Sequence, residues 1–209
     1  MDTTLVMSRF LALLTIAANL AVLGALVLLV SARRSPGAAR IKADIRELLS
    51  VYALPFAALV ALTATLGSLY YSEVANFVPC KLCWYQRIAM YPLALILGIA
   101  AVRRDLSIRR YVVPVVGVGA ALSIFHYLIQ RFPTLSTSGT CDPTAPCTST
   151  WVWQFHYISI PFMALSGFAL IAALLLLAPR ETEPDEGDIE TPPVDKERET
   201  DGLSLSSTQ

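Results

Sequence analysis

The stretch ISIPFMALSGFALIAALLLLA, residues 158–178, decides the class of fold. It carries no charge and has the length of about 20 apolar residues that a helix needs to cross a lipid bilayer. Further runs of this length, with few or no charges, are Phe10–Val30, Leu48–Tyr70 and Tyr111–Ile129. The run Ile88–Val102 is shorter, but it becomes long enough if its helix begins near Pro79. We therefore predict five transmembrane helices.

The composition supports the same class. Hydrophobic residues make up 55% of the 209 residues and charged residues only 15%, which is too apolar for a soluble domain of this size. The sequence therefore predicts an all-α integral membrane protein in contact with membrane lipid, and it predicts no nucleic-acid partner.

The net charge of zero hides an uneven distribution. Residues 180–209 hold 3 Lys or Arg against 10 Asp or Glu, whereas the residues before them hold 13 against 6. The acidic end also contains several prolines and lacks an apolar period, a pattern typical of disorder. We predict a disordered acidic tail over residues 179–209, with no catalytic role.

The basic residues predict how the helices are oriented. They gather in two short connections, residues 31–47 and 103–110. Such loops lie in the cytoplasm by the positive-inside rule. The N-terminus and the other two connections then face outward, and the tail faces the cytoplasm. An alternative is that the first apolar run is a signal peptide cleaved near Val30-Ser31-Ala32. Cleavage would turn every basic loop to the wrong side, so we expect a retained helix in a multi-pass protein of the cell membrane.

Four cysteines carry the chemistry: Cys80, Cys83, Cys141 and Cys147. All fall in or beside the two outward connections, where the compartment is oxidising, so disulfides are expected. The residues alone leave open whether these are structural staples or redox-active pairs. A zinc site of four thiolates is a third interpretation. It explains neither the membrane setting nor a nearby arginine, and we expect no metal.

The first pair belongs to the motif PCKLCWYQR, residues 79–87. Pro79 suits the first position of a helix, and a helix N-terminus stabilises thiolates, which favours a reactive C-x-x-C pair. Arg87 shares a helical face with both cysteines and lies about one turn deeper than Cys83. An arginine below the membrane surface usually faces the protein interior, although long side chains also reach back to the interface.

His126 offers a partner for Arg87 from the fourth helix. By the predicted topology it lies at a similar depth, on one face with Ser123 and Gln130. Together the two side chains would suit a quinone carbonyl oxygen. The alternative for His126 is an ordinary hydrogen-bonded interior histidine. The second cysteine pair, in CDPTAPC at residues 141–147, lies in a loop stiffened by two prolines. A disulfide there is sterically possible, and a simple loop staple is its alternative.

These motifs resemble the disulfide bond formation protein B (DsbB) family, and within it the branch called BdbC. The resemblance rests on four stretches: residues 79–87, FHYLIQ at 125–130, PCT at 146–148 and ISIPF at 158–162. It covers about residues 48–178 and implies a four-helix transmembrane bundle of thiol oxidase type. Residues 1–47 would add an extra N-terminal helix with its basic cytoplasmic loop. Residues 179–209 would form the tail.

The resemblance implies a role for each site residue. Cys141 and Cys147 would form the disulfide that re-oxidises an extracytoplasmic thioredoxin-like thiol oxidase of the DsbA or BdbD kind. Cys80 and Cys83 would then re-oxidise that loop pair. Cys83 would face a membrane quinone, ubiquinone or menaquinone, with Arg87 stabilising negative charge and His126 lining the quinone site. The implied activity is that of a protein dithiol:quinone oxidoreductase.

Two other functions stay open at this point. One is a non-catalytic membrane scaffold with two structural disulfides, which the C-x-x-C stacked over Arg87 disfavours. The other is a reductase of a small epoxide or quinone, related to vitamin K epoxide reductase. Those proteins carry the loop pair before the C-x-x-C, the reverse of the order here. The loop cysteines are also much closer together than in Gram-negative members, so the long-loop mechanism of those members need not apply.

Overall fold

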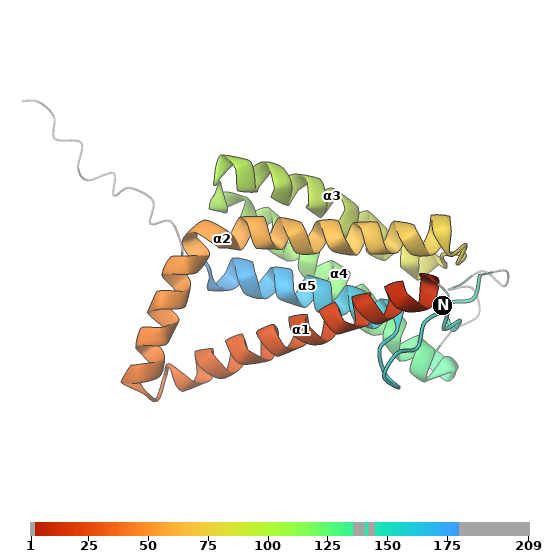
Figure 1. Ribbon diagram of the computed structural model, residues 1–209, viewed down its shortest axis with the longest axis horizontal. Coiled ribbons are helices and arrows are strands. Elements are labelled where there is room, and N and C mark those ends of the chain that lie inside the picture. The colour runs from red at the N-terminus through yellow and green to blue at the C-terminus, as the bar shows by residue number, and fades with distance from the viewer. Residues whose placement is uncertain (1–2, 136–140, 142–144, 180–209) are drawn as a thin grey trace, which may run out of the picture.

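A computed structural model describes residues 3–135, 141 and 145–179 of the chain. Within these residues, five helices are long and apolar enough to cross a membrane. They are α1 (Thr3–Ser31), α2 (Pro36–Leu69), α3 (Lys81–Arg103), α4 (Arg109–Arg131) and α5 (Ile160–Leu177) (Figure 1). Three short helical turns, η1 (Tyr70–Val74), η2 (Leu106–Ile108) and η3 (Pro133–Leu135), follow α2, α3 and α4. The prediction of an all-α membrane protein is confirmed, whereas the predicted disordered tail, residues 179–209, lies outside the described residues from residue 180 onward.

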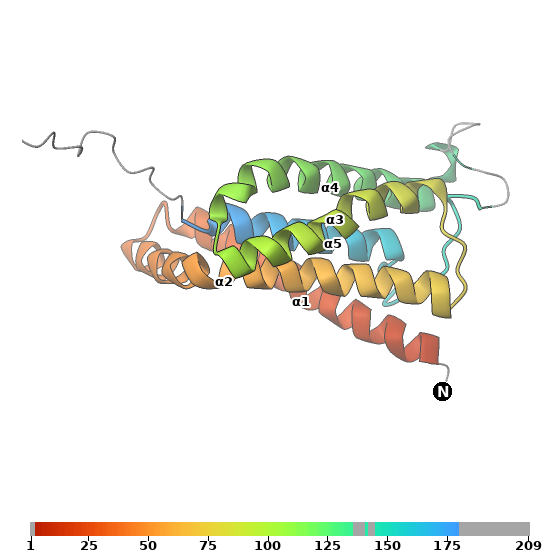
Figure 2. The same cartoon turned by 90° about the horizontal axis from the view of Figure 1, so that it is seen from above.

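Helices α2 to α5 form the bundle. Each packs against the next along the chain, and α5 returns to pack against α2, so the four helices close a ring (Figures 1 and 2). Its core holds fully buried apolar side chains such as Leu97, Val116 and Phe168. Helices α4 and α5 approach closely at Gly119 of α4, because a Cβ there would collide with the Phe168 ring of α5. The expected four-helix bundle therefore forms as a packed unit.

Helix α1 lies outside this ring. It packs against α5 and α2, and its buried residues, Ser8, Ala12 and Thr15, all lie in its N-terminal half. Toward its other end α1 separates from α5 (Figure 1). Most of its large apolar side chains are exposed in the protein, as expected for a helix surrounded by lipid. The chain thus has an additional N-terminal helix beside the bundle, as the sequence predicted.

Helix α2 is longer than its apolar run predicted. It begins at Pro36 rather than near Leu48, so the basic connection shrinks to a few residues. Ser35 and Pro36 suit the N-cap and the first helical position, and the residues that follow are mostly good helix formers. Figure 1 shows the helix bent between this polar arm and its long apolar segment. Pro55 lies inside α2 and lacks the N–H that would bond to the carbonyl four residues before it, which accounts for a bend.

Helix α3 also begins later than predicted. Cys80 is its N-cap and Lys81 its first residue, so Pro79 precedes the helix instead of opening it. The difference matters for the chemistry, because an N-cap side chain points at the free N–H groups of the first turn. The first cysteine of the motif therefore occupies the position where the helix end acts most directly on its sulfur.

Candidate functional site

The start of α3 positions Cys80 and Cys83. As the N-cap, Cys80 accepts a hydrogen bond from the backbone N–H of Cys83, with 3.4 Å between nitrogen and sulfur. The two sulfur atoms are 3.1 Å apart as a dithiol, so a small movement would join them in a disulfide. Cys80 is buried and Cys83 is half-buried. One helical turn thus holds two thiols in position for reversible oxidation.

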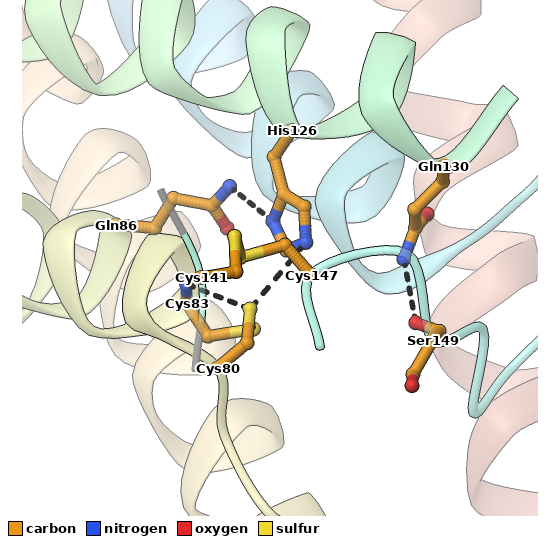
Figure 3. Close-up of a disulfide and its surroundings, with 8 residues drawn as sticks. All are labelled: Cys80, Cys83, Gln86, His126, Gln130, Cys141, Cys147 and Ser149. Carbon is orange, nitrogen blue, oxygen red and sulfur yellow. Dashed lines mark hydrogen bonds between the residues drawn. A yellow bond between two sulfur atoms is a disulfide. The ribbon is translucent and has the colours of Figure 1, made fainter. Parts of the chain in front are cut away.

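His126 of α4 reaches this pair from the other side of the bundle. Its Nε2 lies 3.5 Å from the sulfur of Cys80, and its Nδ1 lies 3.1 Å from Nε2 of Gln86 (Figure 3). Because the Gln86 amide donates to Nδ1, the proton of a neutral imidazole is on Nε2, facing the sulfur. The imidazole is almost fully buried. It is therefore oriented to donate a hydrogen bond to a Cys80 thiolate.

The surroundings of Cys80 favour its ionised form. The hydrogen bond from the Cys83 thiol contributes most to lowering the pKa of Cys80 below its ordinary value, and contact with His126 lowers it further. Burial acts in the opposite direction, but it does not outweigh these hydrogen bonds. The thiolate is the species that attacks disulfides, so Cys80 is prepared for exchange.

The loop pair lies directly beside the helix pair. Cys141 and Cys147 form a disulfide with 5.8 Å between their Cα atoms. Cys147 is fully buried in a cluster with Cys80, Leu82 and Ile129, and both Cys83 and Cys141 pack against this cluster (Figure 3). The pairs come from separate parts of the chain, and the fold brings them together. The pairing itself is the one that the family resemblance implied.

A hydrogen bond ties the loop to α4. Gln130 donates from Nε2 to the carbonyl oxygen of Ser149, two residues beyond the disulfide, at 3.0 Å (Figure 3). Ser123, expected on the same face, instead bonds back to the carbonyl of Gly119 within α4. The three residues of this predicted polar face therefore have different contacts. His126 contacts Cys80, Gln130 bonds to the loop, and Ser123 bonds within its own helix.

Arg87 lies beside Cys83 and turns toward α2. Its Nε donates to the Ser68 hydroxyl at 3.0 Å and its Nη2 to the Ser68 carbonyl at 3.2 Å, while Tyr91 donates to the same hydroxyl at 3.2 Å. The guanidinium also lies over the Trp84 ring, 5.2 Å from its centroid. These contacts hold a cation inside the protein at the depth of the first turns of α3. Nothing in the sequence identified Ser68, which lies on another helix.

A cavity of about 580 Å³ opens next to Cys83 and Arg87. Its walls come from α1, α2, α3 and α5, Phe77 and Trp151 from the connections also line it, and its lining is mainly apolar. His126 is not among the lining residues. It lies instead, with Cys80, at a much smaller cavity under the loop. The large cavity thus borders Arg87 and not His126, and the shared quinone site of these two residues stays a prediction.

The same residues have metal-ligating atoms close together. The ligand atoms of Cys80, Cys83 and His126 all lie within 4.8 Å of one another. The zinc site of four thiolates that the sequence left open is not formed, because Cys141 and Cys147 are joined to each other. Gln86 was also missed at the sequence level, although its position three residues after Cys83 could have placed it on the same face.

Comparisons with known proteins agree with this geometry. Residues 50–178 match the family model described as disulfide bond formation protein DsbB. The chain is 50% identical to disulfide bond formation protein C of Bacillus subtilis over 118 residues, which cover 56% of this chain and 86% of that protein. It is 48% identical to a probable disulfide formation protein of Oceanobacillus iheyensis, covering 58% of this chain and 84% of the relative.

A more distant relative extends the match. A probable disulfide formation protein of Coxiella burnetii is 41% identical over 135 residues, 64% of this chain and 92% of that protein. No solved structure matches the chain. The family model covers both cysteine pairs, the greater part of α2 and all of α3, α4 and α5, and it leaves out α1 and the start of α2. From the helical bundle, the paired cysteines and these matches together, it follows that the chain belongs to the DsbB family of disulfide bond formation proteins, in the branch that includes the Bacillus protein C.

Proposed function

We propose that this chain is a membrane thiol:quinone oxidoreductase that re-oxidises a thioredoxin-like dithiol protein on the extracytoplasmic side. The observation that carries the proposal is the row of three features in contact: a loop disulfide, a helix-borne C-x-x-C pair, and an apolar cavity beside Cys83 and Arg87. A non-catalytic scaffold would need neither a dithiol at a helix N-terminus nor a cavity next to it.

The cavity suits a quinone. Its volume lies within the range of about 300–1,000 Å³ typical of small-molecule sites. Its lining combines apolar surface for a ring and the start of a tail with polar side chains from Arg87, Tyr91 and Gln86. A quinone bound there supplies an acceptor for the two electrons and two protons that the Cys80–Cys83 dithiol loses when it becomes a disulfide.

The first exchange takes place at the loop. A thiolate of the partner attacks the sulfur of Cys141, which is more exposed than that of Cys147, and Cys147 leaves as a thiolate. The second thiol of the partner then attacks its own mixed disulfide and releases Cys141. The partner ends as a disulfide, the loop pair ends as a dithiol, and two electrons have moved from one to the other.

The second exchange takes place between the pairs. With Cys80 and Cys83 joined as a disulfide, the freed Cys147 is already packed against Cys80. Attack and resolution restore the loop disulfide and leave the Cys80–Cys83 dithiol. His126 then holds Cys80 as a thiolate, while Cys83 faces the cavity. Arg87 stabilises negative charge that develops on that side, as fixed cations do in low-dielectric sites.

The proposal is tested with purified full-length protein, a reduced thioredoxin-like dithiol protein and a short-tailed quinone. We expect one quinone reduced for each partner disulfide formed, followed by quinone absorbance and by thiol titration. A ratio of one to one supports the relay. No quinone reduction while both native disulfides resist mild reductant would instead establish the scaffold function.

The orientation in the membrane is tested separately. In a variant without native cysteines, a thiol placed at Ser72 should react with an impermeant reagent applied to intact cells. A thiol at Ser35 or Ser107 should be shielded, because both lie beside the basic connections. Reaction at Ser35 from outside would reverse the proposed orientation or show that the first helix is cleaved.

A further inference from the structure

Helix α1 forms a wall of the cavity although it lies outside the family match. The matched region begins at residue 50, whereas α1 ends at Ser31. Six residues of α1 line the cavity: Leu11, Leu14, Thr15, Ala17, Ala18 and Ala21. They recur mostly three or four residues apart and so form one stripe along the helix. Opposite this stripe lie residues of α2 and α5, the two helices against which α1 packs.

Three contacts hold this stripe in place. Near the start of α1, Tyr71 and Ser8 share a hydrogen bond of 3.2 Å. One turn further, α1 approaches α2 so closely that a Cβ at Gly67 would lie 3.1 Å from a methyl group of Leu11. Beyond the cavity-lining Thr15, Asn19 donates from Nδ2 to the Ser166 hydroxyl of α5 at 2.9 Å.

The Asn19 contact indicates a specific position for α1. An amide within the hydrocarbon layer is costly unless its groups are paired, and hydrogen bonds between transmembrane helices set which faces meet. Asn19 also bonds to the carbonyl of Thr15, so both protons of its amide nitrogen are used. A helix serving only as a membrane anchor would not need this residue. One polar contact, at Ser8, precedes the stripe that borders the cavity, and the other, at Asn19, lies between its last two residues.

We propose that α1 is the lateral wall of the quinone site and that the first isoprenoid units of the quinone tail pack against its stripe. The inference rests on the proposed function and adds an element that the family match lacks. The ring end lies at Cys83 and Arg87. The tail runs along Leu14, Ala18 and Ala21 and leaves where α1 separates from α5 (Figure 1). No described residue of α1 beyond Thr15 is buried, so this end is open toward lipid.

The first test locates the tail directly. Full-length protein in lipid nanodiscs is irradiated with a benzoquinone whose prenyl tail carries a diazirine, and labelled residues are identified by peptide mass spectrometry. We expect labelling between Leu14 and Ala21 that unlabelled quinone with the same tail removes. Because this readout is covalent labelling, it does not depend on turnover.

The second test uses a matched pair of neighbouring leucines. Both side chains are exposed in the protein, but Leu14 lines the cavity and Leu13 does not. Leu14→Trp should weaken binding of the tailed quinone by about tenfold, because the larger side chain fills space that the tail would occupy. Leu13→Trp should leave binding unchanged. A benzoquinone without a tail should bind both variants like the wild type, which also shows that the ring site is intact.

Each outcome decides one point. Competed labelling confined to α2, α3 and α5 would overturn the wall inference and leave the proposed function standing. Equal effects of the two leucine variants would overturn it as well. Labelling by a photoreactive phospholipid that quinone fails to displace would assign the stripe to lipid. If no residue in the cavity shows competed labelling, the quinone site and the inference about α1 both fail.

Discussion

The two cysteine pairs differ in how the chain holds them. Cys80 and Cys83 lie in the first turn of a long helix, where the backbone, Gln86 and His126 fix their surroundings. Cys141 and Cys147 lie in the connection between α4 and α5 and form a disulfide. Cys141 is half-buried, whereas Cys147 is fully buried. A loop can meet a protein partner, whereas a helix start can tune a thiolate and border a cavity. The comparison indicates a division of labour between partner exchange and electron delivery.

The largest expected effect comes from breaking the loop pair. Cys147→Ser should abolish oxidation of the partner, because the loop then has a single sulfur and forms no disulfide to exchange. Binding of quinone should persist, since Cys147 does not line the large cavity. The measurements are partner oxidation by thiol titration and quinone binding by equilibrium dialysis. Ser149→Ala is the control, because only the backbone of Ser149 bonds to Gln130. Normal partner oxidation in Cys147→Ser would make the loop pair a staple.

Substitutions of Arg87 test the proposed electron transfer from the Cys80–Cys83 pair to the quinone. Arg87→Ala should lower kcat/KM for quinone by about 100-fold, the usual loss when a donor to developing charge is removed. Arg87→Lys should recover part of it, because an ammonium keeps the charge but loses the fork that spans the two oxygens of Ser68. The measurement is steady-state quinone reduction with reduced partner in excess.

A matched arginine controls for loss of packing. Arg131 also lies over a tryptophan, at 5.3 Å from the Trp153 ring, but away from the large cavity. Arg131→Ala should keep wild-type quinone kinetics. Equal kinetics of Arg87→Ala and the wild type would mean that Arg87 only anchors the helix at the interface.

His126 should act on Cys80 and less on the quinone. His126→Ala removes a contact that lowers the pKa of Cys80, so this pKa rises and the thiolate forms at a higher pH. The pH profile of Cys80 alkylation by iodoacetamide, measured in the acidic range, should move upward by about one pH unit, the effect of losing one charge-assisted hydrogen bond. The difference should vanish at high pH, where both proteins are ionised.

The alkylation measurement needs a reduced protein without the loop cysteines and peptide mapping of the modified site. Ser123→Ala serves as the control, since Ser123 lies one turn before His126 and, among the described residues, its hydroxyl bonds only to the Gly119 carbonyl. A variant that raises the KM for quinone without changing Cys80 alkylation would return His126 to the quinone site, as the sequence first indicated.

A smaller effect is expected at the loop anchor. Gln130→Leu removes the bond to the Ser149 carbonyl, a contact of about 1 kcal/mol. The KM for the partner should rise by about fivefold, while quinone reduction by a chemically reduced protein stays unchanged. Pre-steady-state mixing separates the two steps. An equal slowing of partner oxidation and quinone reduction would show that the bond at Gln130 does not act on the loop pair alone.

The smallest effect concerns the acidic tail. A chain that ends after Arg180 should insert and oxidise thiols like the full chain, because the removed residues carry no apolar period with which to pack. Specific activity of the two purified proteins is the measurement. A severalfold loss would give the tail a role beyond a solvated end.

The sequence by itself determined the membrane class, the number of spanning helices and the identity of the reactive groups. Long uncharged runs of about 20 residues indicate helices, because backbone polar groups in a bilayer must be paired within the protein and a helix pairs them within its own segment. The placement of Cys80, Cys83 and Arg87 on one face likewise follows from their spacing and from helical geometry alone. The apolar runs predicted helix ends less well. They missed the polar arm of α2, and Pro79 was placed two residues too far into α3, because polar helix formers and N-caps leave no hydropathy signal.

Only the tertiary structure decided which groups meet. It placed His126 beside Cys80 instead of Arg87, and it put Ser68 under the guanidinium. It also packed the loop disulfide on the helix pair and made α1 a wall of the cavity. The physical reason is that periodicity along a helix fixes which residues share its face, whereas the rotation of one helix against another depends on contacts between distant segments. The close approaches at Gly67 and Gly119 and the bond between Asn19 and Ser166 are such contacts, and no single segment contains both partners.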